Sequence, residues 1–284
     1  MLNRLAFRGI SKAFSWMTHS KGACHGDDLY QWELAQDIKL PKSASIHLSS
    51  PTSQTLSFLK QVLCRYGIAL VTFSSVTHEN EVILSLVRAL GRPHIHDGRG
   101  REIWDVKVGG TDGMEKLAIS HSDSEFFFHT DCCYEEQVPG YFGLYVVQQD
   151  KLGGGVNLLI NTAFIVSRLS AETFRTLRMM TYPIRVPKEF LKGNERIHAL
   201  LVDENHNFRY RHDLIVREEL GERQMAALNE LETLIADPNI WRRMRLSAGQ
   251  MLILDNKRYL HARTPIKDRA RHLKRVRFNM QCAV

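Results

Sequence analysis

From Arg101 onward the chain is divided into many short strand-like runs, and this pattern restricts the possible folds more than any other feature. Each run is long enough for a single strand, and glycine, proline or aspartate residues separate it from the next run. Short strands separated by such turns favour a double-sheet barrel or a jelly roll. The strand-like runs cover residues 102–108, 142–148, 156–160, 182–186, 208–211, 251–254 and 275–281.

Helical patterns accompany these strands, so we expect a mainly β fold with flanking helices. Residues 55–66 carry an apolar stripe that ends at Gly67, and residues 68–73 form an apolar run typical of a buried strand. Apolar residues recur at helical spacing again over residues 82–90. The same periodicity at about 220–236 predicts a helical insert among the strands.

Two separate polar features could form a metal site. The triplet from His129 to Asp131 follows three phenylalanines, and in an extended segment residues i and i+2 project to the same face, as two ligands of one ion must. His261 follows the apolar strand 251–254 and a polar turn, so we expect it at a strand end facing the mouth of the barrel. Each feature alone is common in proteins. Together, two imidazoles and one carboxylate are the ligand set of a non-haem Fe(II) centre that keeps three positions open.

The two parts of this candidate site lie 130 positions apart (261 minus 131), and they must meet. Although 284 residues could form one domain or two, we therefore expect a single domain over residues 1–284. Residues 1–50 would form an N-terminal arm or helical extension, and residues from about 55 to 284 the jelly-roll part. The composition, 44% hydrophobic and 24% charged, is that of an ordinary globular protein. No apolar run approaches the roughly 18 residues that span a bilayer, so we expect no membrane segment.

Basic residues are concentrated near the C-terminal end. Between Lys257 and Arg277, nine lysines and arginines accompany one acid, Asp268. A basic surface could bind nucleic acid. This cluster, however, lacks interleaved aromatic residues and follows a candidate metal ligand. A guanidinium offers planar, permanently charged donors, so Arg271 or Arg275 could bind the far end of a dicarboxylate. We therefore expect a small-molecule partner rather than nucleic acid.

The cysteines and the N-terminus bear on the cellular compartment. Five cysteines, an odd number without C-x-x-C spacing, argue against a structural zinc site and against a disulfide framework. We therefore expect a reducing, cytoplasmic environment in which the adjacent Cys132 and Cys133 only pack near the site. The first 22 residues contain four lysines or arginines and no acid. This leaves an organellar transit peptide open beside a surface helix or an arm.

Several stretches together resemble the taurine dioxygenase and clavaminate synthase-like group, the TauD/TfdA family of Fe(II)/2-oxoglutarate oxygenases. The resemblance covers most of the chain from about residue 55 to its end, and the combination is specific although each piece is common. The matching stretches are residues 67–73, 91–96, 128–131, 153–157, 249–256, 261–265 and 271–275.

The resemblance implies a double-stranded β-helix core, a cupin-like jelly roll, in which His129, Asp131 and His261 bind Fe(II) and are the catalytic residues. It also implies that Arg271 binds the distal carboxylate of 2-oxoglutarate. The implied cofactors are Fe(II), 2-oxoglutarate and O2. Related halogenases carry a small residue in place of the acidic ligand, so Asp131 disfavours halogenation.

Three further positions correspond to residues around the cosubstrate and the substrate. Where relatives often have a threonine for the distal carboxylate, this chain has Asn157, whose amide could donate the same hydrogen bond. Arg275 corresponds to a position that contacts the substrate or supports the cosubstrate. His96 corresponds to a substrate-side histidine.

The resemblance thus implies a non-haem iron, 2-oxoglutarate-dependent dioxygenase that hydroxylates a small anionic or amino-acid-like molecule and releases succinate and CO2. Desaturation or ring formation stays open, as does assembly into a homo-oligomer. One alternative is a non-catalytic jelly roll that binds a metal or ligand without turnover. Another is an oxygenase that acts on nucleic acid or on a protein-bound substrate; its binding to nucleic acid would weaken steeply with salt.

Overall fold

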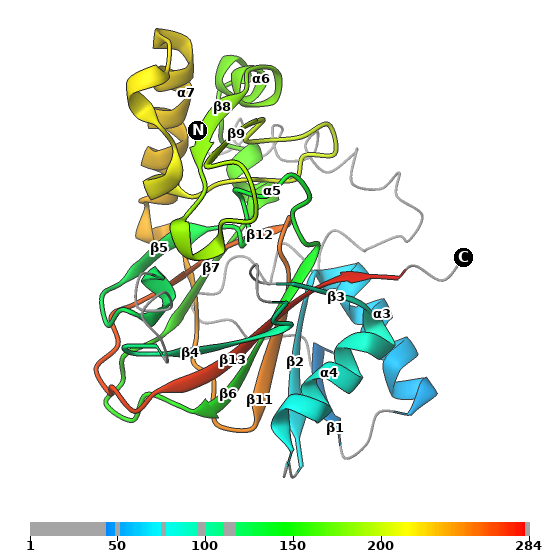
Figure 1. Ribbon diagram of the computed structural model, residues 1–284. Helices are drawn as coiled ribbons and strands as arrows, with labels where there is room; N and C mark the ends of the chain where they lie inside the picture. The colour runs from blue at the N-terminus through cyan, green and yellow to red at the C-terminus, as the bar shows by residue number, and fades with distance from the viewer. Residues whose placement is uncertain (1–43, 49–51, 75–77, 96–99, 111–117, 282–284) are drawn as a thin grey trace, which may run out of the picture.

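The computed structural model describes residues 44–48, 52–74, 78–95, 100–110 and 118–281. In these residues the chain forms a mixed α/β fold with three sheets (Figure 1). The predictions made for the N-terminal arm before residue 44 and for His96 lie outside the described residues. None of the helices described is long and apolar enough to cross a membrane.

The largest sheet has seven strands. Its order is β1-β2-β11-β6-β13-β3, and β4 also pairs with β13. A second sheet has the order β10-β7-β12-β5, and β8 pairs with β9 in a third. The strands are β1 (Ser45–Leu48), β2 (Ile68–Phe73), β3 (Gly91–His94), β4 (Ile103–Lys107), β5 (Phe126–His129), β6 (Tyr141–Gln148), β7 (Asn157–Asn161), β8 (Tyr182–Arg185), β9 (Arg196–Ala199), β10 (Arg242–Met244), β11 (Gln250–Asp255), β12 (Tyr259–Arg263) and β13 (His272–Met280).

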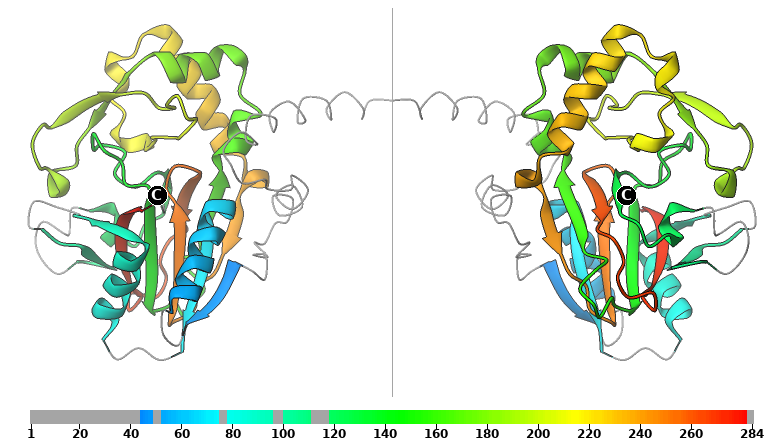
Figure 2. Two further views of the ribbon diagram at one scale, coloured as in Figure 1. Left: turned by 90° about the vertical axis from the view of Figure 1, so that its right-hand side faces the viewer. Right: turned by 90° about the vertical axis from the view of Figure 1, so that its left-hand side faces the viewer.

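The helices lie on one face of the largest sheet and at one end of the molecule. Helices α3 (Ser53–Tyr66) and α4 (Glu79–Leu90) pack beside β2 and β13, whereas α5 (Thr162–Val166), α6 (Ala171–Met179) and α7 (Glu222–Ile235) gather at the end that carries β8 and β9 (Figures 1 and 2). Helix α3 begins at a capping box between Thr52 and Thr55 and ends at Gly67, whose φ of 68° is left-handed. This confirms the predicted stop at Gly67.

Strand β11 explains why the two larger sheets pack together. Its side chains alternate between two apolar surroundings, because successive residues of a strand point to opposite faces. Met251 and Ile253 join the cluster formed with α3 and α4. Leu252 and Leu254 join Leu159 and other residues of the second sheet. Both faces of this strand are therefore buried, and its sequence is a continuous apolar run.

Most of the predicted elements are present. The prediction was a mainly β fold with flanking helices, and the structure shows a mixed α/β fold with several sheets. The strand predicted over residues 208–211 is wrong. Phe208 forms only an isolated bridge to Val202, and Arg211 forms one to His129. This segment lies beside the end of β5, where its backbone pairs with His129 without extending a sheet.

Candidate metal and cosubstrate site

Strand β12 brings the two distant histidines together. It lies between β7 and β5, and its register places His261 directly opposite His129. The two ring centroids are 4.1 Å apart. The expectation that His261 occupies a strand end is wrong, because it lies in the middle of β12. Backbone pairing on both sides of the strand therefore holds this imidazole in place.

Asp131 completes a buried group of three. Its Oδ1 lies 3.7 Å from Nε2 of His129 and 3.8 Å from Nε2 of His261. All three ligand atoms lie within 4.8 Å of one another, so one ion could contact all of them. The expectation that His129 and Asp131 share one extended strand is wrong. β5 ends at His129, and Asp131 lies in the turn that follows, which directs its carboxylate back toward both imidazoles.

The two imidazoles are neutral donors. Nδ1 of His129 lies 2.8 Å from the carbonyl oxygen of Phe127, so an N–H at Nδ1 donates to that carbonyl and leaves the Nε2 lone pair available. That Nε2 is buried and has no hydrogen-bond partner among the described residues. Burial lowers the pKa of His129. Burial and the neighbouring His129 hold the pKa of His261 well below its usual value.

The carboxylate of Asp131 stays ionised although it is buried. Burial alone would raise its pKa, but Arg275 and Arg277 outweigh this effect and hold the pKa well below the usual range. Nη1 of Arg275 donates to Oδ1 at 3.2 Å, and Nε of Arg277 donates to Oδ2 at 2.9 Å. Sequence reasoning missed Arg277. Its i+2 spacing from Arg275 within a strand could have indicated that both face the same side.

Asn256 anchors the turn that carries Asp131, and sequence reasoning missed this role as well. The side chain is fully buried. Its Oδ1 accepts from the Asp131 N–H at 2.8 Å, and its Nδ2 donates to the carbonyl oxygens of Asp131 and Pro139, both at 2.9 Å. The polar turn after β11 thus fixes the position of the candidate carboxylate ligand.

We expect Asn256→Ala to lower the free energy of unfolding by about 3 kcal/mol, since each buried polar group left without a partner costs roughly 1–3 kcal/mol. Urea unfolding would measure the change. Asn229→Ala is the matched control, because Asn229 is exposed on α7 and its loss should change stability by less than about 0.5 kcal/mol. Equal effects of the two substitutions would contradict the anchoring role.

A cavity of about 50 Å³ opens beside the two histidines. Arg271 lines it, is only 4% exposed, and has a buried Nη1 without a partner among the described residues. Burial, with a contribution from nearby Arg263, lowers the pKa of Arg271 to about 10. A buried guanidinium that lacks an anionic partner is costly. The cavity is therefore prepared for a ligand that carries negative charge.

Two more polar side chains line the same cavity. Arg263 lies two residues beyond His261 on β12 and donates through Nη2 to the carbonyl oxygens of Ser122 and Ser124. The sequence analysis did not single it out, although the i+2 spacing from His261 placed both on one face. Asn157, which the sequence analysis selected, also lines the cavity, and its Nδ2 lies 3.4 Å from the carbonyl oxygen of Met244.

Gly155 makes room for the Arg271 side chain. Its φ is +60°, and a Cβ added there would lie 2.6 Å from Nε of Arg271. We expect Gly155→Ala to displace the guanidinium and raise the KM for an anionic cosubstrate about tenfold, which corresponds to 1.4 kcal/mol. Steady-state kinetics would measure it. Gly109→Ala is the control, because Gly109 also has a positive φ but nothing lies within 4 Å of its added Cβ. An unchanged KM in Gly155→Ala would contradict this role.

More than half of the basic cluster of residues 257–277 is buried. Five of its nine lysines and arginines are at most 9% exposed: Arg263, Arg271, Lys274, Arg275 and Arg277. Arg275 lines the cavity beside the histidines and also donates to Asp131.

A second, smaller cavity of about 10 Å³ is lined by Asp131 and His129. Arg211, Cys132 and Tyr134 are among its lining residues. Arg211 is held by Asp213, to which its Nε and Nη2 donate at 2.9 and 2.8 Å. His129 lines both cavities, whereas His261 lines the larger one.

A set of two imidazoles and one carboxylate next to an open cavity defines the class of non-haem iron oxygenases. A family model described as taurine catabolism dioxygenase TauD, TfdA family matches residues 34–277. The chain belongs to this family, whose members are non-haem iron, 2-oxoglutarate-dependent oxygenases. No curated protein sequence matches the chain.

Solved structures share the fold. An asparagine oxygenase in complex with Fe(II), hydroxyasparagine and succinate has a TM-score of 0.65 and 18% identity, covering 97% of this chain and 91% of its own. The non-haem iron oxygenase OrfP with iron and α-ketoglutaric acid has a TM-score of 0.62 and 16% identity, covering 81% of each chain. A taurine dioxygenase from Burkholderia xenovorans has a TM-score of 0.56 and 17% identity, covering 82% of this chain and 83% of its own.

Proposed function

We propose that this protein binds Fe(II) through His129, Asp131 and His261, binds 2-oxoglutarate in the adjacent cavity through Arg271, and hydroxylates a small amino-acid-like molecule. The observation that carries the proposal is the convergence of three buried ligand atoms beside an unpartnered buried guanidinium. A cluster of buried ligand atoms or a buried guanidinium, taken singly, occurs in proteins of many functions. Here the ligand cluster and the guanidinium lie beside the same cavity, so one site offers a position for the metal and a position for the cosubstrate.

The residues fit iron by the chemistry of their donor atoms. Two neutral imidazoles and one ionised carboxylate supply the donors that the non-haem Fe(II) centre requires. The Nε2 of His129 is buried without a partner among the described residues, which is costly unless a ligand occupies it. The contact between Nδ1 of His129 and the Phe127 carbonyl fixes the ring orientation that presents Nε2.

The cavity also fits a dicarboxylate. Arg263 and Arg271 line it, and no acidic residue among those described does. The dianion of 2-oxoglutarate would offset this positive charge, with its distal carboxylate on Arg271 and its keto acid end toward the metal ligands. Asn157 supports the proposal as a lining residue whose amide can donate to a carboxylate. Arg275 would keep the cosubstrate and the carboxylate of Asp131 apart.

When bound, Fe(II) would activate O2 as 2-oxoglutarate is converted to succinate and CO2, and this oxidises a C–H bond of the substrate. The contribution of the chain is placement. Asn256 and Arg277 hold Asp131 so that Oδ1 faces the histidines. The apolar residues Phe126, Phe142 and Leu144 line the cavity and limit water there.

We infer an amino-acid-like substrate from two observations. The asparagine oxygenase holds hydroxyasparagine, and OrfP has been captured with a hydroxylated arginine. Hydroxylation is the default outcome, and a different substrate pose would give desaturation or ring formation. Assembly into a homo-oligomer stays a prediction.

We also propose that the two larger sheets form a double-stranded β-helix core and that the residues from about 55 onward act as one catalytic domain. The support is that β5 and β12 of one sheet carry the histidines, whereas β13 of the other carries Arg275 and Arg277. Side chains of both sheets thus contribute to a single site.

A substrate screen tests the proposed function. The protein would be loaded with Fe(II) and 2-oxoglutarate, exposed to O2 with individual amino acids or sulfonates, and assayed for succinate. We expect one amino acid to accelerate succinate release at least about tenfold, the effect of 1.4 kcal/mol, and to gain one oxygen atom by mass spectrometry. Iron binding without substrate-dependent succinate from any candidate would instead favour a non-catalytic jelly roll.

A further inference from the structure

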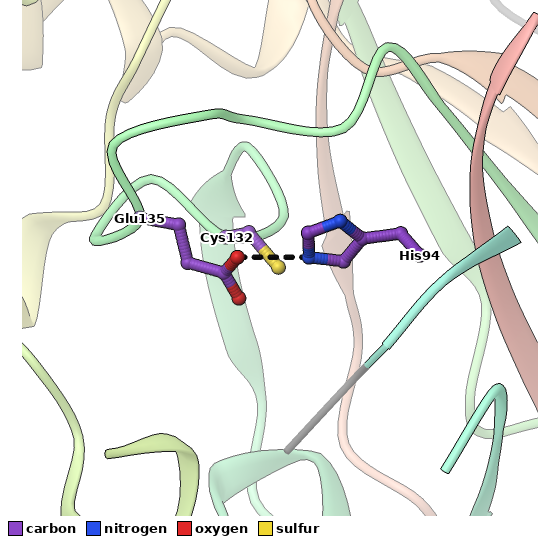
Figure 3. A group of neighbouring side chains, drawn as sticks. All are labelled: His94, Cys132 and Glu135. Carbon is purple, nitrogen blue, oxygen red and sulfur yellow. Dashed lines mark ion pairs between the residues drawn. The ribbon is translucent and has the colours of Figure 1, made fainter. Parts of the chain in front are cut away.

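A second group of potential metal ligands lies next to the first and shares no side chain with it. His94 ends β3, and Cys132 and Glu135 belong to the turn and the segment that follow Asp131 (Figure 3). One ligand atom from each of the three lies within 4.8 Å of the other two. Figure 3 shows the thiol sulfur beside the contact between the imidazole and the carboxylate. These donors come from parts of the chain nearly 40 positions apart (132 minus 94).

The backbone at Cys132 is unusual. Its φ is 57°, in the left-handed region that L residues with side chains rarely adopt. The N–H of Glu135 donates to the Cys132 carbonyl at 2.9 Å, and Asn256 fixes the preceding residue, so the turn is held in this conformation. The consequence is that the thiol and the Glu135 carboxylate converge on His94 from the same turn.

Each oxygen of the Glu135 carboxylate has one basic neighbour. Nε2 of His94 lies 2.8 Å from Oε2 of Glu135, and Nζ of Lys192 lies 3.1 Å from Oε1. Lys192 and His94 therefore contact different oxygens of this carboxylate. Cys132 is 2% exposed, but the side chains of His94 and Glu135 are 17% and 14% exposed, so the group reaches solvent at one edge.

We propose that His94, Cys132 and Glu135 form a second site for a divalent transition-metal ion of the zinc class, with a fourth position left to water. A thiolate, an imidazole and a carboxylate are donors that Zn²⁺ accepts in tetrahedral geometry, whereas Mg²⁺ and Ca²⁺ prefer oxygen ligands alone. On binding, the Cys132 thiol gives its proton to solvent and its sulfur forms the bond to the metal. The ion replaces the direct contact between His94 and Glu135.

An ion at this position would join β3 to the turn that carries Asp131. The segment between residues 131 and 135 is short, so fixing Cys132 and Glu135 also restricts the candidate iron ligand that precedes them. The site is independent of the iron proposal, because none of its three ligands belongs to the first group.

Cobalt(II) spectroscopy tests this site without any assay of turnover. Thiolate bound to Co²⁺ gives an intense sulfur-to-metal charge-transfer band in the near ultraviolet, and the His129, Asp131 and His261 group contains no sulfur. We expect the anaerobic full-length protein to show this band on Co²⁺ addition. The band should be absent in Cys132→Ser and retained in Cys133→Ser and in His261→Ala. Retention in His261→Ala would place the band outside the candidate iron site.

Two milder variants guard against misfolding of Cys132→Ser. His94→Ala and Glu135→Gln should each lower the Co²⁺ affinity, measured by titration of the charge-transfer band, by at least about tenfold. Even outer-shell substitutions cost roughly 10–100-fold in metal affinity. No band in the wild type, a band that persists in Cys132→Ser, or unchanged affinity in both milder variants would overturn the proposal. Those results would leave His94, Glu135 and Lys192 as a hydrogen-bonded ionic group only.

Discussion

His261→Ala is expected to reduce Fe(II) affinity by more than about 100-fold, because the loss of an outer-shell partner alone costs roughly 10–100-fold. The imidazole that this substitution removes is neutral in the folded protein, since burial and His129 keep its pKa low. The substitution therefore leaves no buried charge without its partner, and the fold should persist. Turnover that depends on added iron should fall with the affinity. Anaerobic Fe(II) titration and circular dichroism would measure both quantities.

The matched control is His198→Ala. His198 is exposed on β9 and lies outside the group of candidate ligands. Its loss should leave iron affinity and turnover unchanged. If His261→Ala bound Fe(II) as tightly as His198→Ala, His261 would be removed from the metal site.

Arg271→Ala is expected to raise the KM for 2-oxoglutarate by about 100-fold or more, because truncating one partner of a buried, hydrogen-bonded charge pair costs about 2–5 kcal/mol. The KM of Arg271→Lys for 2-oxoglutarate should lie between those of the wild type and Arg271→Ala. The lysine ammonium keeps the charge but loses the planar pair of donors. The weak visible band of a keto acid chelated to Fe(II), recorded anaerobically against 2-oxoglutarate concentration, would report binding apart from turnover.

The same position should show opposite effects on binding and on stability. Arg271 is buried without an anionic partner among the residues described, and burial lowers its pKa to about 10, so its charge opposes folding. We expect Arg271→Met to raise the free energy of unfolding by about 2 kcal/mol, the order of cost of an unsatisfied buried group, while it abolishes the band. Arg269→Ala is the control, because the side chain of Arg269 is 73% exposed. A lower stability in Arg271→Met, or a large KM change in Arg269→Ala, would contradict this account.

The sequence predicted the strands well where both faces are buried and poorly where irregular backbone forms the site. The run 251–254 became β11 because its side chains pack into cores on both sides of the sheet. The run 208–211 alternates aromatic and charged residues, a pattern typical of a strand, yet it forms only isolated bridges. Its place beside β5 depends on contacts with distant segments, which local periodicity does not contain.

The candidate metal ligands could be predicted from residue type and spacing. The residues that hold Asp131 in place could not be predicted in this way. His129, Asp131 and His261 could be selected because few residue types bind iron, and Arg271 because a dicarboxylate requires a cation. Asn256 and Arg277 contact Asp131 through tertiary structure. An asparagine in a turn and an arginine in a strand have many ordinary roles, so only the folded arrangement reveals what they hold.

We propose above that His129, Asp131 and His261 bind one iron ion. The most direct measurement is an anomalous difference map from crystals grown anaerobically with Fe(II), recorded on both sides of the iron absorption edge. The account predicts one edge-dependent peak in contact with Nε2 of both histidines and Oδ1 of Asp131. An iron peak at another position, with these three side chains bound only to protein or water, would contradict it.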